Sequence, residues 1–218
     1  MSALGTLDTC LHAIHAGLQR LSPRLGLESF VLVAQPVPPG LAQAAPSGSV
    51  GVRLAAPNDP VLSQVNRPPE ELQRRFASPG VCLVAEKGSR LVGFLWLLFG
   101  AYREPDGSCE FELSGSDCAW DLDVFVVPQE RLGRSFVRLW EAANAVLRER
   151  RIRWSMSRIS AFNPRSLSSH RALGAVKVGR ISFLRLFDLQ LFCGTVRPFV
   201  KLSVVGRGAP RIRVKPPA

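Results

Sequence analysis

Several features typical of disulfide-rich, metal-binding and metal-dependent proteins are missing from this sequence. The cysteines form an odd, scattered set without a C-x-x-C motif, and the three histidines do not complete a zinc spacing. These absences exclude a small disulfide scaffold and leave no metal signature. We expect free thiols in a reducing compartment. The cysteines are Cys10, Cys82, Cys109, Cys118 and Cys193.

Long hydrophobic runs are also missing. The most apolar stretch, Leu91 to Tyr102, has 12 residues and is bounded by Arg90 and Arg103, which is too short to span a bilayer as a helix. The N-terminus lacks the basic region, unbroken apolar core and small-residue cleavage site of a secretory signal. The sequence therefore predicts a cytoplasmic protein without a membrane span.

Acidic residues are scarce in the C-terminal part of a chain that otherwise has ordinary globular composition. The 218 residues are 46% hydrophobic and 21% charged, which suits one domain or one domain with a subdomain. Up to Glu130 there are 9 basic and 14 acidic residues, and beyond it 19 basic and 3 acidic, for a net charge of +11. This asymmetry indicates an anionic partner for the C-terminal part: nucleic acid, a membrane surface or a phosphate-bearing cofactor.

Hydrophobic periodicity predicts the elements of the first half. A leucine-rich stripe predicts an N-terminal helix that either packs on the protein's own core or binds a partner. Asn66, followed by two prolines and two acids, is the expected N-cap of the second helix. The expected elements are a helix over 4–21 ended by Pro23, strands at 30–34 and 50–54, a helix over 66–77, a hairpin of strands at 81–86 and 91–99, and a strand at 110–113.

The second half begins with a strand, a basic turn and a long helix. The strand covers 119–127, the turn 129–135, and a strongly periodic helix runs to about residue 151. A strand at 152–157 follows, and then Asn163 and Pro164 open a helix that stops at Gly174. A strand at 176–187, with a bend at Gly179, precedes a basic tail from Gly194.

This order of elements resembles the GNAT family of acyl-CoA-dependent N-acyltransferases over roughly residues 50–188. The resemblance implies an α+β (α/β) fold: a central mixed, mostly antiparallel twisted sheet flanked by helices, here with an N-terminal helical extension. It divides the chain into an N-terminal helix, strand and Pro/Gly/Ser-rich connection (1–48), a GNAT-like acyl-CoA-binding domain (49–190) and a basic C-terminal tail or strand (191–218).

The segment VFVVPQERLGRSFVRLWEAA carries the first part of the resemblance. It is similar to the family's strand and pyrophosphate loop, Q/R-x-x-G-x-G/A, but Glu130 and Ser135 depart from that pattern. Backbone N–H groups at a helix start bind phosphate whatever the side chains are. The alternative is an ordinary strand-to-helix turn with solvated arginines. The residues that the resemblance implies bind the cofactor here are Val126, Arg131, Leu132, Gly133, Arg134 and Ser135.

The segment from Asn163 to Ala175 carries the second part. It is similar to the family's N-x-x-A-x-x-x-Y-x-x-x-G-F, with Asn163, Ser166, His170, Gly174 and Ala175 at matching offsets. The resemblance implies that Asn163 and Ser166 contact the cofactor. It also implies that His170, in place of Tyr, protonates the departing CoA thiolate, a role that an imidazole can fill. The alternative is a structural histidine with a hydrogen bond.

An acceptor amine must lose a proton before it attacks a thioester. The resemblance implies that the base comes from the strand before the loop or from a neighbouring strand. Asp121 and Asp123 alternate along that strand and are expected to share one face. They are the catalytic candidates beside His170, with solvated acids as the alternative.

These features predict an N-acyltransferase that transfers acetyl, or a longer acyl group, from CoA to a small-molecule or peptide amine by direct attack in a ternary complex. No metal is expected, and a homodimer stays open. One alternative is an inactive acyl-CoA sensor or partner-binding protein. Another is nucleic-acid binding, but no helix-turn-helix, RNA-recognition sequence or zinc finger accompanies the basic charge, and 24 of the 28 basic residues are Arg, as coding bias would give.

Overall fold

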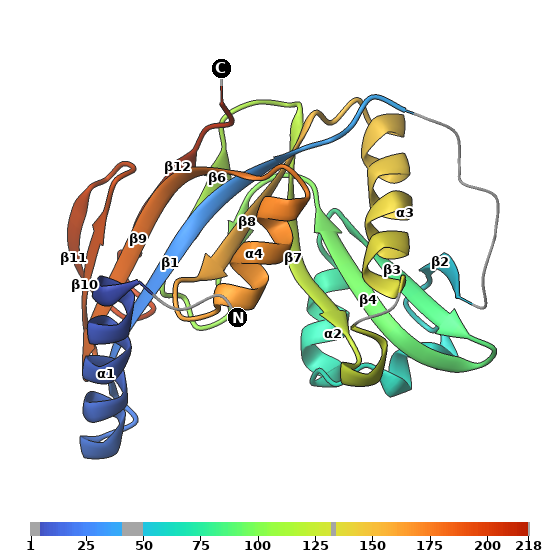
Figure 1. Cartoon of the computed structure of the whole chain (residues 1–218). Coiled ribbons are helices and arrows are strands. Elements are labelled where there is room, and N and C mark those ends of the chain that lie inside the picture. The colour runs from blue at the N-terminus through green and yellow to red at the C-terminus, as the bar shows by residue number, and fades with distance from the viewer. Residues whose placement is uncertain (1–4, 41–49, 132–133, 218) are drawn as a thin grey trace. The chain divides into compact units, whose positions relative to one another are not determined.

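The computed structural model describes residues 5–40, 50–131 and 134–217 (Figure 1). This part of the chain has four α-helices among mostly antiparallel strands, so the predicted α+β class is confirmed. It divides into two compact units. Unit 1 comprises Met1–Pro36, Ala101–Ser116 and Met156–Ala218, and unit 2 comprises Val37–Gly100 and Asp117–Ser155. The domain boundaries that the resemblance implies, after residues 48 and 190, stay a prediction.

Unit 1 is built on a sheet with the strand order β11-β10-β9-β1-β8 and a smaller sheet with the order β12-β6-β5. The part of β8 (Trp154–Ser160) from Met156 onward belongs to it. The other elements are α1 (Thr6–Leu21), β1 (Leu25–Pro36), β5 (Tyr102–Arg103), β6 (Glu110–Leu113), α4 (Pro164–Ala172), β9 (Val176–Leu186), β10 (Leu189–Gly194), β11 (Val200–Val204) and β12 (Arg211–Val214).

The N-terminal strand β1 is longer than the predicted 30–34 and lies inside the sheet of unit 1. It pairs antiparallel with β9 from Leu25 opposite Leu186 to Ala34 opposite Val176. The register shifts where Leu32 faces Gly179, which is the bend expected at that glycine. Apolar periodicity found only the continuous apolar run of β1, because the residues before it alternate with polar ones.

Helix α1 forms where the leucine stripe predicted it, but none of its residues is buried. It lies against β1, and polar contacts hold it there. Asp8 pairs with Arg180 of β9, and the Gln19 amide donates to the Leu25 carbonyl oxygen at 2.7 Å. Helix α1 is therefore a surface helix, and its Leu7, Ile14 and Leu21 stay exposed.

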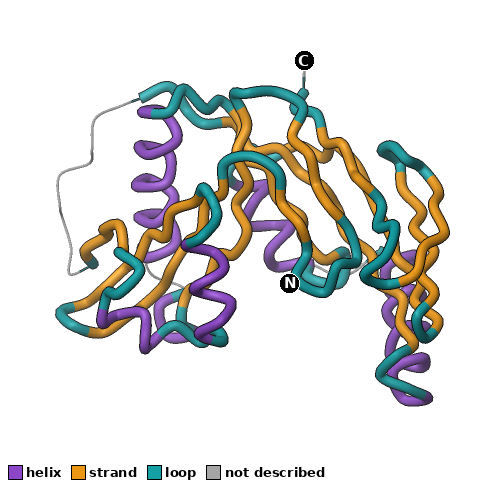
Figure 2. The backbone as a smooth tube through the Cα atoms, turned by 180° about the vertical axis from the view of Figure 1, so that it is seen from behind, coloured by secondary structure: helices purple, strands orange, loops and turns teal. Residues whose placement is uncertain are grey.

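Unit 2 has the strand order β7-β4-β3-β2, and each neighbouring pair is antiparallel. Its predicted hairpin turns at Gly88, with φ of 60°, which suits glycine. Figure 2 shows its strands and helices from behind. The elements are β2 (Gly51–Ala55), η1 (Pro60–Gln64), α2 (Pro69–Phe76), β3 (Gly80–Lys87), β4 (Arg90–Leu98), β7 (Cys118–Val126), η2 (Pro128–Glu130), α3 (Ser135–Glu149) and the start of β8.

The core of unit 2 lies on both faces of its central strands. Helix α3 packs against β3 and β4 and buries Leu139, Trp140 and Leu147. Residues of η1 and α2 form a second cluster with Phe94 and Trp96 of β4. Strand β4 is buried along nearly its whole length, as expected for a strand covered on both faces.

Four local predictions need correction. The N-cap of α2 is Pro68, not Asn66, and no side chain caps that helix. Strand β8 continues to Ser160, beyond the predicted end at 157. The predicted basic tail or strand contains the strands β11 and β12, and the strand β10 before it was missed, because these short runs carry too little periodicity to be recognised. The short elements η1 and β5 were missed for the same reason.

Candidate active site

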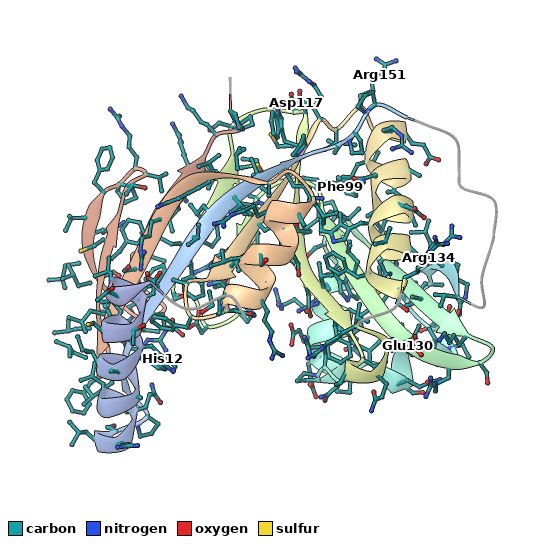
Figure 3. All side chains as sticks on the ribbon, viewed as in Figure 1. His12, Phe99, Asp117, Glu130, Arg134 and Arg151 are labelled. Carbon is teal, nitrogen blue, oxygen red and sulfur yellow. The ribbon has the colours of Figure 1, made fainter. Side chains whose placement is uncertain are left out.

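The turn between β7 and α3 is compact. Pro128–Glu130 form the single 3₁₀ turn η2, and the Arg131 Nε then donates to the Val126 carbonyl oxygen at 3.1 Å. Leu132 and Gly133 lie outside the described residues. Arg134 is exposed at the start of α3, Ser135 is buried as its first residue, and no side chain caps the helix (Figure 3). Uncapped N–H groups beside an exposed arginine suit an anion.

Glu130 stands where the family pattern has Gln or Arg, and the structure neutralises it. Both its carboxylate oxygens accept from the Lys87 ammonium at 2.8 Å, and a guanidinium nitrogen of Arg90 lies 3.5 Å from one of them. The two cations come from the β3–β4 hairpin. Glu130 therefore does not present an uncompensated negative charge at the turn.

Asp123 on β7 is clamped by two arginines. The Arg67 Nε and NH2 groups donate to its two carboxylate oxygens at 2.8 and 2.9 Å, and Arg75 adds a third bond at 2.8 Å. The Asp123 side chain is only 12% exposed. This hydrogen bonding to Asp123 raises the pKa of Arg67. The two guanidinium groups therefore hold the Asp123 carboxylate in a fixed position.

The clamp is supported by aromatic side chains of β4. The Arg67 guanidinium lies 5.4 Å from the centre of the Phe94 ring, and that of Arg75 lies 5.5 Å from the Trp96 ring. Both distances are within the range of cation–π contact. No sequence pattern indicated these arginines, because they stand 56 and 48 residues from Asp123.

Asp121 has different neighbours from Asp123. It is buried, and its carboxylate accepts a hydrogen bond of 2.9 Å from the Ser155 hydroxyl. A bulge in the β4–β7 ladder sets Asp123 opposite Trp96 and Asp121 opposite Leu97. Neighbouring residues of β4 point to opposite faces of the sheet. The expectation that the two carboxylates share one face is therefore wrong, since the bulge inserts a residue between their pairing positions.

A pocket of about 420 Å³ opens in unit 2 within the segment that joins β2 to β3. Arg67 forms part of its wall and so connects the pocket to Asp123. The rest of the wall is largely apolar, with a few neutral polar groups. The lining residues are Pro57, Asn58, Leu62, Ser63, Val65, Arg67, Pro69, Leu72, Gln73 and Phe76.

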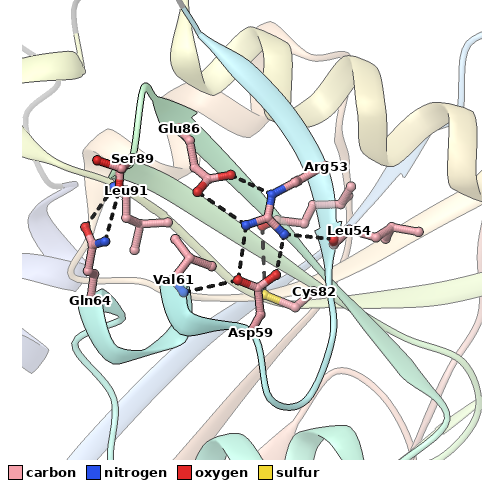
Figure 4. Close-up of polar contacts among 10 residues, drawn as sticks. Arg53, Leu54, Asp59, Val61, Gln64, Cys82, Glu86, Ser89 and Leu91 are labelled. Carbon is pink, nitrogen blue, oxygen red and sulfur yellow. Dashed lines mark hydrogen bonds and ion pairs between the residues drawn. The ribbon is translucent and has the colours of Figure 1, made fainter.

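A polar network fixes the pocket wall at η1 (Figure 4). The Arg53 guanidinium binds Glu86 at 2.7 Å and also pairs with Asp59. Asp59 in turn accepts from the backbone N–H of Val61 at 3.1 Å and so caps η1. At the other end of η1, the side-chain amide of Gln64 forms hydrogen bonds of 2.9 and 3.0 Å with the backbone of the β3–β4 hairpin. The pocket is therefore preformed.

The remaining predicted residues lie together on α4 in unit 1. The Asn163 side chain accepts from the Ser166 N–H at 3.1 Å, so it caps the helix as its position predicted. His170 is buried, and burial lowers its pKa to about 4. At neutral pH the imidazole is therefore uncharged. The structure thus brings Asn163, Ser166 and His170 onto one helix, and it places the other candidates in unit 2.

The cysteines are thiols in this structure. Burial raises the pKa of Cys82, Cys109 and Cys118 to about 12, so these thiols are not poised as nucleophiles. Among the described residues, no group of His, Cys, Asp and Glu could hold a metal ion. None of the described helices is both long and apolar enough to cross a bilayer.

Comparison with known proteins gives a likeness of fold. No family profile and no curated protein sequence matches the chain. A solved structure assigned to the GNAT acetyltransferases, from Novosphingobium aromaticivorans, is similar at a TM-score of 0.53 and 15% identity, over 73% of this chain and 64% of that one. The structure of a Drosophila protein is similar at a TM-score of 0.52 and 14% identity, over 84% of this chain and 59% of that one. The structure of an aminoglycoside N-acetyltransferase in complex with CoA has a TM-score of 0.46 and 18% identity, over 60% of this chain and 90% of that one. The chain has the GNAT fold, which its two motifs had indicated.

Proposed function

We propose that this protein is an acyl-CoA-dependent N-acyltransferase that acts on a small amine. The observation that carries the proposal is the turn from β7 into α3, where an uncapped helix start, the exposed Arg134 and a neutralised Glu130 suit a pyrophosphate. The GNAT fold around this turn supports the same role. Bound acetyl-CoA or a longer acyl-CoA would supply the thioester.

The acceptor side of the proposal rests on unit 2. A pocket of about 420 Å³ is in the size range of small-molecule sites. Its largely apolar wall suits the uncharged body of an amine better than a polycation. The Arg67 and Arg75 clamp makes Asp123 a fixed carboxylate that can orient an amine. Asp121, buried beside Ser155, is then the other candidate to accept the amine's proton.

The proposed role of His170 follows from its protonation state. With a pKa of about 4, the imidazole holds no imidazolium proton at neutral pH. It can still donate a hydrogen bond through its neutral N–H group. In this proposal His170 stabilises a leaving thiolate by such a bond. We therefore expect the pH–rate profile of the wild type to contain no titration near pH 6.5 that His170→Gln removes.

Calorimetry with acetyl-CoA and longer acyl-CoAs tests the cofactor assignment. Arg134→Gln is expected to weaken binding about threefold or more, because it removes one charge beside the phosphates. Arg151→Gln is the matched control, since Arg151 is an exposed arginine just beyond the other end of α3. A folded wild type that binds no acyl-CoA would contradict the proposal.

A second candidate is an acyl-CoA sensor that lacks catalysis. Two observations favour it: Asp123 is fully engaged by two cations, and His170 is uncharged. Release of free CoA thiol in the presence of a panel of small amines separates the two functions. Thiol release that depends on the amine supports the enzyme, and tight acyl-CoA binding without any release supports the sensor.

A further inference from the structure

One face of the β9–β10–β11 strands in unit 1 is apolar, and most of its hydrophobic residues are exposed. The strand registers place its residues in three rows, with Leu186 opposite Leu189 and Leu189 opposite Val204 in the first. The row of Leu184, Leu191 and Leu202 follows, and then that of Ser182, Cys193 and Val200. We call this surface the apolar face; its hydrophobic residues are Leu184, Leu186, Leu189, Leu191, Val200, Leu202 and Val204.

The other face of the same strands is an ordinary core. Ile181, Phe183 and Phe192 alternate with the residues of the apolar face and are buried. On the side of the apolar face, α1 lies against β1, and its Asp8 pairs with Arg180 of β9. Strands β10 and β11 form the edge of this sheet (Figure 1).

Both hairpins at the ends of these strands add an exposed phenylalanine. Phe187 follows β9 and Phe199 precedes β11, and both have positive φ, 57° and 59°. A bulky residue in that conformation is strained, whereas Gly or Asn would fit easily. The two hairpins thus hold large apolar side chains in solvent at a conformational cost. Strained residues of this kind cluster at functional surfaces.

The size of the surface exceeds what scattered exposed residues explain. Leu186, Leu189, Val200, Leu202, Val204 and the two phenylalanines are each 43–67% exposed. Together they present roughly 600 Å² of apolar surface, the upper end of patches on monomeric proteins. A standard interface buries about 800 Å² on each partner, a similar area.

We propose that the apolar face binds a second copy of this chain, with the two faces packed against each other about a two-fold axis. The chain carries a net charge of +11, so two copies repel over most of their surfaces. None of the nine residues in the three rows of the face is charged. Arg24, which lies over the Phe187 ring at one end of the surface, pairs with Asp188. The three rows therefore offer an acidic partner no cation, whereas an identical neutral face is self-complementary. Two sheet faces pack in this way in sandwiches.

Sedimentation equilibrium of the purified full chain, from about 1 to about 100 μM, tests the proposal. The wild type is expected to dimerise. Leu202→Asp is expected to raise the dissociation constant at least about 100-fold, because the two-fold axis buries the new carboxylate twice. Leu54→Asp is the matched control, since Leu54 is similarly exposed on a strand of unit 2, and it should leave the dimer intact. Val200→Asp repeats the test if Leu202→Asp fails to fold.

The exposed thiols give a second readout. Cys193 lies within the apolar face and Cys10 lies on α1. At high protein concentration, the alkylation rate of Cys193 should fall relative to that of Cys10, and Leu202→Asp should restore it. A wild type that stays monomeric across this range overturns the proposal, as does a dimer that Leu202→Asp and Val200→Asp leave unchanged. A monomer that sediments with anionic vesicles, and loses this binding in Leu202→Asp, would replace the second copy with a lipid surface.

Discussion

The two units hold their candidate site residues in opposite electrostatic states. In unit 2, Asp123 and Glu130 are charged and are held by Arg67, Arg75 and Lys87. In unit 1, burial keeps His170 neutral. Pairing fixes a charge in place, whereas desolvation removes it. The candidate residues are therefore ion-paired in one unit and uncharged in the other, and the two sets should respond differently to mutation and to pH.

Breaking a buried ion pair should have the largest effect, and unit 1 contains such a pair outside the candidate site. Arg158 binds Glu104 at 2.8 Å and lies 4.2 Å from the centre of the Phe30 ring. Burial raises the pKa of Glu104, although Arg158 opposes this. Arg158→Met should lower the free energy of unfolding by about 3 kcal/mol, because it leaves a buried carboxylate without its cation. Urea unfolding at neutral pH measures the loss.

Glu104→Gln is the control for this pair. It removes the group that burial penalises, so it should change the free energy of unfolding by less than about 1 kcal/mol. Equal losses in Arg158→Met and Glu104→Gln would show that the pair itself is strongly stabilising. That result would mean that ion pairing outweighs desolvation in unit 1, as it does in unit 2.

The clamp in unit 2 should give the next largest effect. Asp123→Asn removes the charge that holds Arg67 and Arg75 but keeps the shape of the side chain. We expect a loss of about 2 kcal/mol in stability, because two partly buried guanidinium groups then lie close together with only Glu71, which pairs with Arg75, as a counter-charge. Urea unfolding measures it. The double variant Asp123→Asn, Arg75→Met should recover part of the loss, and no recovery would contradict the role of the clamp.

The pH dependence of stability should distinguish the ion-paired residues of unit 2 from the neutral His170 of unit 1. The pKa of His170 falls from 6.5 to about 4 on folding. Protonation therefore favours the unfolded chain. The stability that the neutral imidazole of His170 contributes is fully present above pH 6.5 and is lost as the pH falls toward 4. Between about pH 7 and about pH 5.5 the wild type should lose about 1.2 kcal/mol more than His170→Gln. Urea unfolding at both pH values checks it, and parallel losses would show that His170 is accessible to protons.

The sequence predicted what is local in this structure. Asn163 and Pro164 open α4, and Gly174 ends it with φ of 84°, because a cap and a left-handed residue act within one turn. The turn from β7 into α3 was found for the same reason. The fold class and the family likeness followed from the order of such local elements.

The contacts that set the state of the site could not be predicted, because they join residues far apart in the chain. The clamp on Asp123 is one case. The charge asymmetry of the sequence is another, since acids of the 101–116 segment pair with C-terminal arginines in unit 1. Arg211 lies 3.4 Å from Glu110, and Arg213 lies 3.0 Å from Glu112. Part of the C-terminal basic excess is therefore paired within the protein, although the chain keeps its net charge of +11.

The smallest effect tests whether Asn163 is more than a helix cap. Its side chain accepts from the Ser166 N–H, so Asn163→Ala should cost about 1 kcal/mol of stability. Asn163→Asp keeps an acceptor oxygen and should leave stability unchanged. If the amide also contacts the cofactor, as the resemblance implies, Asn163→Asp should weaken acyl-CoA binding in calorimetry, because a carboxylate would face an anion. Equal binding by wild type and Asn163→Asp would assign Asn163 to the helix alone and leave the cofactor to the charged groups of unit 2.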